Sequence, residues 1–319
     1  MNPHGTLGAR GAGPAAESEG TVGRPLSVRR RKVVTLDDAV RLVEDGATVG
    51  LGGWIFYNTP MALVRALARA GRRDLTLVPA PGSIGPDLLI GAGSVSRVFC
   101  VFITFEHLGF APNFRRRSES GALQVLEMDG PGLAAGLRAA ADGLPYVPIF
   151  DVGTDLPRVN PEWYRPLPAV DGRRLLAVPP IRLDVVLVHA QQADEYGNAQ
   201  LLGGAFFDPL LAMAARRVVV SVDRLVPTRT IRRVPERTKL PSYLVTAVVE
   251  CPRGAHPTGS HTLYDPDEGH LRAYVEAGTR PDAYEKYLDR YVRVGEERYR
   301  ELVRRGARRA RTGCEGDER

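Results

Sequence analysis

The stretch that decides the fold is DGATVGLGGWIFYNTP, residues 45–60. Asp45-Gly46 is typical of a helix end, and the short apolar run that follows is typical of a buried strand. Thr59-Pro60 then supplies an N-cap and an N1 proline for a helix that continues through MALVRALARAG. Gly52-Gly53 lies between strand and helix. Such a turn lets a ligand approach the main chain and leaves N–H groups free for it, although a βα turn without a ligand has the same spacing.

The same alternation of strand and helix continues along the chain. An N-terminal helix is expected after Thr35, which with Asp38 resembles a capping box. Further strands are predicted at 75–80, 97–103, 182–190, 217–226 and 243–250, and helices at 87–93, 129–143, 208–217 and 268–278 and between 281 and 304. Several strands are continuous apolar runs, as in a parallel sheet covered on both faces. The sequence therefore predicts a three-layer α/β/α fold with a mostly parallel sheet.

One ordered domain between two tails is the expected organisation. Residues 1–32 are rich in Gly, Ala, Pro and Arg without hydrophobic periodicity, so we predict a disordered tail there and a second, basic tail at 304–319. The ordered domain then spans 33–303. The proline-rich stretch 157–180 is predicted to be an irregular insertion within it.

Charge and composition favour a cytoplasmic protein without a nucleic-acid or membrane partner. Residues 1–32 carry six Lys or Arg against two Glu, and 304–319 carry six Arg against three acidic residues, so most of the net +6 belongs to the ends and the remainder is near neutral. No run approaches the roughly 20 apolar residues of a membrane span. The N-terminus lacks the apolar region of a signal peptide. The three cysteines have no metal-binding spacing and suggest no disulfide framework, so neither a metal nor an oxidising compartment is expected.

Three segments in register resemble the alpha subunit of family I CoA-transferases of the glutaconate type. Residues 45–60 are similar to the first CoA-transferase signature, with Trp54 for a Phe, Asn58 for a Gly and Gly50 within the apolar triplet. Residues 188–204, VHAQQADEYGNAQLLGG, resemble the HAQQA…DG…GG region of that subunit. Residues 254–265 resemble its GAHP…LYD region. The similarity covers about 33–300 and implies a NagB/RpiA-like fold.

The resemblance also implies a chemistry and a partner. In this family a glutamate attacks an acyl-CoA thioester, forms a mixed anhydride and is captured by CoA as a glutamyl thioester. The family places that glutamate in the beta subunit, within a Ser-Glu-Asn-Gly-like motif that this chain lacks. The near-match Ser118-Glu119-Ser120-Gly121 is interpreted as an exposed turn. We therefore expect half of a heterodimeric or heterotetrameric enzyme, inactive alone, with acyl-CoA and a carboxylic acid as substrates and coenzyme A entering only as the thioester.

Glu106 is the candidate catalytic residue of this chain. It follows the apolar run VFCVFITF and precedes His107, and a carboxylate beside an imidazole at a strand end suits acid–base chemistry. An ordinary loop glutamate paired with Arg115 or Arg116 is the alternative. Because some relatives hydrolyse or ring-open acyl-CoA, a catalytic glutamate of the alpha subunit near this position is the second functional hypothesis.

The remaining candidate residues are expected to bind substrate or CoA. They are Gly52, Gly53, Trp54, Ser83, Gln191, Gln192, Gly203, Gly204 and His256. The glycine turn would contribute N–H groups to a thioester oxyanion, and the glutamine amides would orient a carboxylate or thioester. For His256 a structural role competes with a place in the site. A sugar-phosphate isomerase or deaminase of the same fold is a more remote possibility, and a non-catalytic protein acting through its basic tails is a third.

Overall fold

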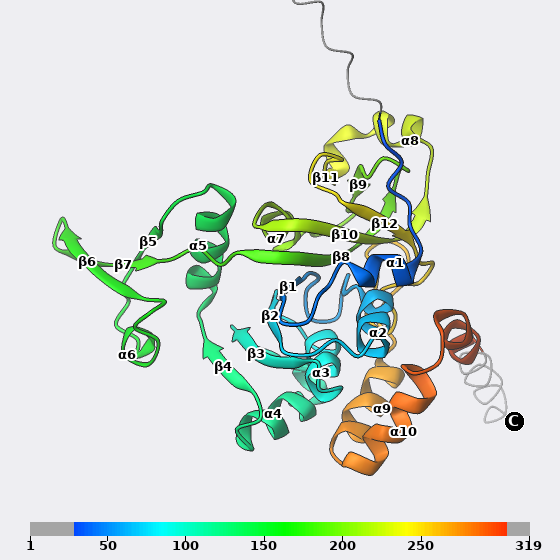
Figure 1. Cartoon of the computed structure of the whole chain (residues 1–319), viewed down its shortest axis with the longest axis horizontal. Coiled ribbons are helices and arrows are strands. Elements are labelled where there is room, and N and C mark those ends of the chain that lie inside the picture. Colours follow the sequence, from blue (N-terminus) through cyan, green and yellow to red (C-terminus); the bar gives the residue numbers. More distant parts are fainter. Residues whose placement is uncertain (1–28, 305–319) are drawn as a thin grey trace, which may run out of the picture. The chain divides into compact units, whose positions relative to one another are not determined.

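A nine-stranded, mostly parallel sheet forms the centre of the part of the chain that the computed structural model describes, residues 29–304 (Figure 1). The predictions for residues 1–28 and 305–319 lie outside it. Its strands are β1 (Thr48–Leu51), β2 (Leu75–Pro79), β3 (Val95–Cys100), β4 (Gln124–Glu127), β8 (Leu183–Ala193), β9 (Ala199–Gln200), β10 (Ala215–Leu225), β11 (Thr238–Leu240) and β12 (Ala247–Glu250). The order β4-β3-β2-β1-β8-β10-β12 is parallel throughout, while β9 and β11 add antiparallel pairs beside the end of β8.

Helices cover both faces of this sheet, as the apolar strands predicted. The helices are α1 (Leu36–Arg41), α2 (Met61–Arg69), α3 (Ile84–Gly91), α4 (Pro112–Glu119), α5 (Gly130–Ala141), α6 (Leu156–Val159), α7 (Asp208–Met213), α8 (Thr228–Arg233), α9 (Glu268–Gly278) and α10 (Pro281–Tyr291), with short 3-10 turns η1 (Glu106–Leu108) and η2 (Pro235–Arg237). Helices α1, α2, α3, α9 and α10 share one core with one face of the strands, whereas α5 and α7 pack on the other. The three-layer α/β/α prediction is confirmed.

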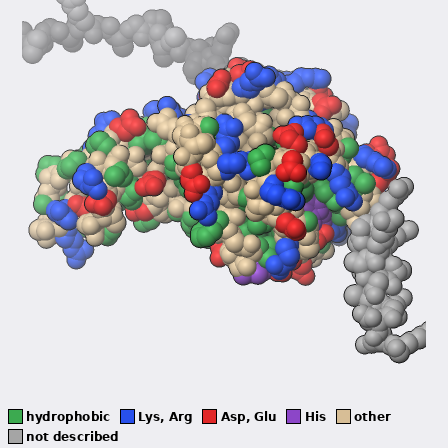
Figure 2. All heavy atoms as spheres, turned by 90° about the horizontal axis from the view of Figure 1, so that it is seen from below, with side chains coloured by type: hydrophobic (Ala, Val, Ile, Leu, Met, Phe, Trp, Pro, Cys, Tyr) green, Lys and Arg blue, Asp and Glu red, His purple; other side chains and the backbone are tan. Residues whose placement is uncertain are grey.

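The proline-rich stretch 157–180 is not irregular, and that prediction is wrong. It contains two strands of a separate antiparallel sheet, β5 (Val147–Phe150), β7 (Arg173–Val178) and β6 (Arg165–Val170), in that order. Asp171 and Gly172 join β6 to β7 with φ values of 50° and 74°, the left-handed pair of a tight hairpin. This sheet lies at the left of Figure 1, and apolar side chains show on the surface at the left of Figure 2.

Several helix boundaries differ from the sequence-based prediction. Helix α3 starts at Ile84, three residues earlier than expected. Helix α2 starts one residue later than expected, with Pro60 as N-cap and no side-chain cap, whereas Thr35 does cap α1 through the N–H of Asp38. Helix α7 ends at Met213, because Ala215 already belongs to the long strand β10. The C-terminal segment is not one helix: α10 ends at Tyr291 and helical residues resume at 296–304.

The face of the molecule shown in Figure 2 carries both signs of charge, and the two cysteines of the described chain are free. Acidic and basic side chains are intermixed on the face shown in Figure 2. Cys100 and Cys251 are buried free thiols, and burial raises the pKa of each to about 12. In the part of the chain that is described, no helix is long and apolar enough to cross a membrane.

Candidate functional site

The candidate site lies where the loops after β1, β2, β9 and β12 meet beside the carboxyl ends of the parallel strands, the edge where α/β sheets bind ligands. Strand β8 carries Gln191 two residues from its end, and the β1 loop carries Asn58. The loop after β12 returns to the same edge, because Gly259 accepts the Asn58 N–H and donates to the Phe56 carbonyl. Segments far apart in the sequence thus converge here.

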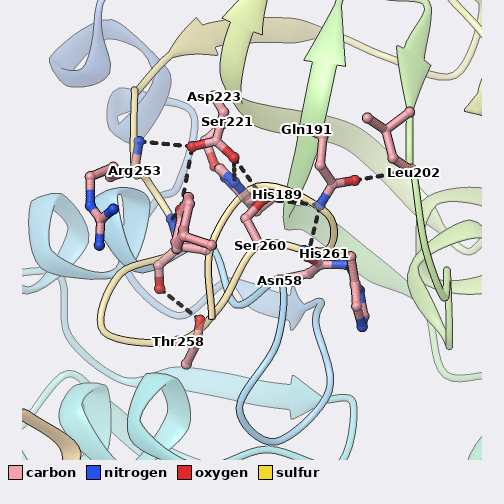
Figure 3. Close-up of polar contacts among 12 residues, drawn as sticks. Asn58, His189, Gln191, Leu202, Ser221, Asp223, Arg253, Thr258, Ser260 and His261 are labelled. Atoms are coloured by element: carbon pink, nitrogen blue, oxygen red, sulfur yellow. Dashed lines mark hydrogen bonds and ion pairs between the residues drawn. The ribbon is translucent and has the colours of Figure 1, made fainter. Parts of the chain in front are cut away.

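A buried chain of side-chain hydrogen bonds centres on Gln191 (Figure 3). Its Nε2 donates to Asn58 Oδ1 at 2.9 Å and to Ser260 Oγ at 3.0 Å, and its Oε1 accepts the Leu202 N–H at 2.8 Å. Asn58 Nδ2 in turn lies 3.0 Å from Nδ1 of His261, the half-buried ring at the outer end of the chain. Gln191, Asn58 and Ser260 have no exposed surface. Because a buried amide fully used in this way fixes its neighbours, Gln191 sets the relative position of three loops.

Asp223 is the anchor at the inner end of this chain. One carboxylate oxygen accepts from Ser260 Oγ at 2.7 Å and lies 3.0 Å from His189 Nε2. The other accepts the Arg253 N–H at 2.7 Å and the Tyr264 hydroxyl at 3.3 Å. Burial acts to raise the pKa of Asp223, but the hydrogen bonds from His189, Ser260 and Arg253 outweigh it and hold that pKa below its usual value. Asp223 is therefore a structural carboxylate with no oxygen left for substrate.

His189 links Asp223 to Ser221 in an arrangement that resembles a Ser-His-Asp triad. His189 Nδ1 lies 3.0 Å from Ser221 Oγ, and His189 Nε2 faces Asp223. Ser221 and His189 are wholly inaccessible, and Ser221 Oγ donates to the Val188 carbonyl at 3.3 Å. A nucleophile that no substrate can reach does not catalyse, so this group holds β8 against β10.

The glycine turn does not leave its N–H groups free in this chain. Gly52 donates to the Leu187 carbonyl at 2.9 Å, and Gly53 donates to Asp208 Oδ1 at 2.8 Å. The expectation of unpaired amides is therefore wrong for these two groups. Burial raises the pKa of Asp208 to about 7, while the Gly53 hydrogen bond acts against it. A thioester oxygen reaches the Gly53 N–H only if it shares or replaces this partner.

Aromatic rings surround the turn. Trp54 stacks on Phe206 and Phe207, with ring centroids 5.2 and 6.3 Å apart, and meets Phe102 edge-on at 6.2 Å. Tyr57 stacks on His261 at 4.5 Å. Phe102 and Phe206 remain partly exposed, so the rings form an apolar rim beside the polar network. Such a rim excludes water from a reacting thioester.

Backbone strain concentrates in the same loops. Most of the non-glycine residues with positive φ in the described chain lie there: Ile55, Asn58, Glu106, Phe206, Arg253 and Thr262. A β-branched residue at φ 47°, such as Ile55, is a rare and costly conformation. Strain of this kind persists where surrounding contacts fix the backbone, commonly at functional sites.

The structure brings together most of the predicted binding residues. Gly52, Gly53, Trp54, Gln191, Gly203 and Gly204 lie around the network just described. A Cβ at Gly203 would approach the His261 ring to 2.6 Å, so the absence of a side chain lets the two loops touch. Ser83 is buried and donates to the Ile55 carbonyl, which places it behind the turn.

Two predicted residues lie outside the network. Gln192 follows Gln191 in β8 and therefore faces the opposite side of the sheet. It donates to Gln200 Oε1 at 2.8 Å. His256 is buried between the Tyr299 hydroxyl at 2.7 Å and Asp267 Oδ2 at 3.1 Å, where it attaches the C-terminal helical residues. Its contacts match the structural alternative.

Glu106 is exposed at the start of η1, with φ 50°. Arg115 pairs with Glu119 and Arg116 donates to the Gly278 carbonyl, so neither pairs with Glu106. The Glu106 carboxylate has no hydrogen-bond or ion-pair partner within residues 29–304. Its neighbour His107 meets Phe56, a residue of the β1 loop, edge-on at 6.1 Å. Glu119 ends α4 as an exposed residue and does not face the network.

Sequence reasoning missed five residues that build the site: Asn58, Asp208, Asp223, Ser260 and His261. Asn58 stands where the family signature has Gly, and its φ is 56°. This backbone conformation explains both residues at this position, since it suits Gly and Asn tolerates it best among residues with side chains. The others carry no local signal, because their partners are distant in sequence. Within residues 29–304 no group of three or more His, Cys, Asp or Glu is placed to hold a metal ion.

Comparison with known proteins now decides the family. Residues 33–251 match the family model "Coenzyme A transferase". The chain belongs to the coenzyme A transferase family. It is 30% identical to the alpha (A) subunit of glutaconate CoA-transferase from Acidaminococcus fermentans over 82% of this chain and 88% of that one. The crystal structure of that enzyme superposes with a TM-score of 0.80 at 28% identity, covering 85% and 92% of the two chains.

A further relative is named for a different activity. The "Cholesterol ring-cleaving hydrolase IpdA subunit" of Rhodococcus jostii is 37% identical over 88% of this chain and 98% of that one. The transferase relative confirms the expected resemblance to the alpha (A) subunit. The chain is a CoA-transferase-family alpha subunit, and the family resemblance read from residues 45–60, 188–204 and 254–265 is confirmed.

Proposed function

We propose that this chain is the alpha half of a two-chain enzyme, a heterodimer or heterotetramer, that moves CoA from an acyl-CoA thioester to a carboxylic acid. The observation that supports the missing half is the state of the carboxyls at the site edge. Asp194 and Asp223 are buried and saturated with hydrogen bonds, and Asp208 is buried behind the turn. None of these three is placed to attack a substrate, which supports a beta chain that supplies the attacking glutamate; the exposed Glu106 is considered separately below.

In the proposed reaction, a carboxylate oxygen of the beta chain attacks the thioester carbonyl carbon. The C–S bond breaks, CoA leaves as the thiolate, and an acyl–glutamyl anhydride remains. The thiolate then attacks the glutamyl carbonyl, releases the acyl group as its carboxylate and leaves a glutamyl thioester. The acceptor acid reverses both steps. The aromatic rim beside the glycine turn borders the thioester and excludes water, which would hydrolyse the anhydride.

Hydrolysis or ring opening by Glu106 is the second candidate. Its free carboxylate, held at a strained φ of 50° next to a loop of the site, is what a general base requires. The R. jostii relative, which is named a ring-cleaving hydrolase, also favours this second candidate. Here Glu106 would take a proton from water, and no covalent acyl-enzyme would form.

One set of measurements separates the two. The alpha and beta chains are purified together, CoA transfer to an added carboxylate is measured, and free thiol release is measured without acceptor. Transfer that survives Glu106→Gln supports the first candidate, while thiol release that Glu106→Gln abolishes supports the second. Glu119→Gln is the matched control, since Glu119 is also exposed but lies away from the site. CoA transfer by the alpha chain alone contradicts the first candidate.

We also propose that coenzyme A takes part only as the thioester substrate. The location that we propose for the protein is the cytoplasm. The buried Cys100 and Cys251 remain free thiols, which suits a reducing compartment. Thiol labelling of the protein as isolated tests this point. A disulfide in the isolated protein would argue for an oxidising one.

A further inference from the structure

A buried carboxyl with one unpaired oxygen lies directly behind the glycine turn. Asp208 has no exposed surface, and its Oδ1 accepts the Gly53 N–H at 2.8 Å. Its Oδ2 has no hydrogen-bond partner in the described part of the chain. Nearly all buried polar atoms in proteins are paired, so the fold keeps this carboxyl here at a cost in stability.

Asp208 and the turn are fitted to each other. A Cβ built on Gly52 would lie 2.4 Å from Asp208 Oδ1 and 2.8 Å from Val188 Cγ1, so any side chain at 52 would push against the carboxyl. Gly53 has φ +94°, and a Cβ there would lie 2.7 Å from the Thr59 nitrogen. The two glycines are therefore what allows the carboxyl to reach the amide.

The contact joins two segments through their aromatic residues. Trp54 directly follows Gly53, and Phe206 and Phe207 directly precede Asp208. The Trp54 ring stacks on both phenylalanines. Burial raises the pKa of Asp208 to about 7, so a neutral acid, which tolerates the apolar surroundings, is well populated at neutral pH.

We propose that Asp208 is a positioning residue for the site: its carboxyl holds the Gly53 N–H and so fixes Trp54 against Phe206 and Phe207. The effect of Asp208 on catalysis rests on the proposed function. The contact between the Asp208 carboxyl and the Gly53 N–H, called the clamp below, does not. The carboxyl acts through the turn and is not assigned a contact with substrate.

Trp54 fluorescence tests the clamp without any substrate. The chain has two tryptophans, Trp54 and Trp163, so Trp163→Phe leaves Trp54 as the only reporter. In that background Asp208→Ala is expected to shift emission to the red and to raise acrylamide quenching about twofold, because the turn opens locally. Asp208→Asn keeps an oxygen for the Gly53 N–H and is expected to restore the parent signal.

Matched variants keep the test decisive. Asp87 is also fully buried and accepts a backbone N–H, that of Phe114 at 2.7 Å, but it has no contact with the turn. Asp87→Asn should lower the melting temperature and leave Trp54 quenching unchanged. If Asp208→Ala does not fold, Gly52→Ala displaces the carboxyl from the other side and should give the opened Trp54 signal. A parent-like signal in folded Asp208→Ala or Gly52→Ala overturns the proposal.

Activity of the alpha–beta complex then tests the catalytic role. Asp208→Ala is expected to lower kcat by about 10- to 100-fold with a smaller change in KM, since misplacing a site residue costs rate. Asp208→Asn should recover most of it. An inactive parent complex would refute the proposed function while leaving the fluorescence result to decide the clamp. An open Trp54 signal with parent kcat would overturn the catalytic part.

Discussion

Gln191 Nε2 donates to Asn58 Oδ1 at 2.9 Å, and this bond joins the end of β8 to the loop after β1 across 133 residues of sequence. Both side chains are wholly buried. The pair fixes the glycine turn relative to the loop that carries Ser260 and His261. The shape of the site therefore depends on one amide.

Removing that amide should be costly. Gln191→Ala leaves the Leu202 N–H without an acceptor. It also removes one hydrogen bond each from Asn58 Oδ1, which keeps the His261 N–H, and from Ser260 Oγ, which keeps Asp223. We expect a loss of about 2–3 kcal/mol in the free energy of unfolding. Gln192→Ala, which removes one bond to Gln200, is the control and should cost about 1 kcal/mol. Urea unfolding measures both. Equal losses would show that the network adds nothing beyond a single hydrogen bond.

The buried ion pair of Arg65 and Glu296 should hold the C-terminal helical residues. Arg65 Nε lies 3.0 Å from Glu296 Oε2, Nη1 donates to the His256 carbonyl at 2.8 Å, and the guanidinium lies 3.6 Å from the Tyr299 ring centroid. Arg65→Met strands the Glu296 charge, so we expect a loss of roughly 3–5 kcal/mol.

The exposed Arg293 pairs are the matched comparison for that variant. Arg293→Met, which breaks contacts with Glu285 and Asp289 at the surface, should cost less than about 1 kcal/mol. Thermal or urea unfolding of both variants gives the comparison. A loss at Arg65 no larger than at Arg293 would contradict the anchoring role.

Stability should fall in acid because of His270. Burial, followed by the nearby His256, lowers the pKa of His270 to about 3, whereas an unfolded histidine titrates near 6.5. The unfolded state thus binds the proton first as pH falls. The stabilisation from neutral His270 is complete above about pH 6.5 and is lost at up to about 1.4 kcal/mol per pH unit below it.

Unfolding free energies measured between pH 8 and 5 test this dependence. His270→Gln should flatten the slope below pH 6.5 relative to the parent protein. An unchanged slope in His270→Gln would assign the acid sensitivity to other groups.

Removing the backbone strain at Glu106 should raise the stability of the fold, and it should lower activity if the carboxylate is catalytic. Its φ of 50° suits glycine, so Glu106→Gly is expected to stabilise the fold by up to about 1 kcal/mol. If the carboxylate serves as the base, the same variant loses thiol-releasing activity. Asp74→Gly, at a turn with φ 56° away from the site, should stabilise without that loss. Full hydrolytic activity in Glu106→Gly would remove Glu106 from the mechanism.

Much of the fold was predictable because its signals are local. The apolar run at 182–190 and the helical periodicity of 61–69 are each visible within a dozen residues. The hairpin at Asp171-Gly172 was missed although Asp-Gly is a strong turn signal, because the prolines of β6 and the exposed strand faces hide the pattern.

The site was less predictable for a physical reason. Gln191 stood out because it ends an apolar strand, but its partners Asn58 and Ser260 are 133 and 69 residues away. Asp208 resembled an ordinary first residue of a helix, and only its burial against Gly53 shows a role. Contacts between distant loops leave no periodicity in the sequence.

The most direct test of the account traces the acyl group. The reconstituted alpha and beta chains are incubated with radiolabelled acyl-CoA, treated with borohydride or hydroxylamine to trap activated carboxyls, and separated under denaturing conditions. We predict that the trapped glutamate belongs to the beta chain and that the alpha chain carries no modification. A covalent adduct on a carboxylate of the alpha chain would contradict the claim that this chain provides the site without its nucleophile.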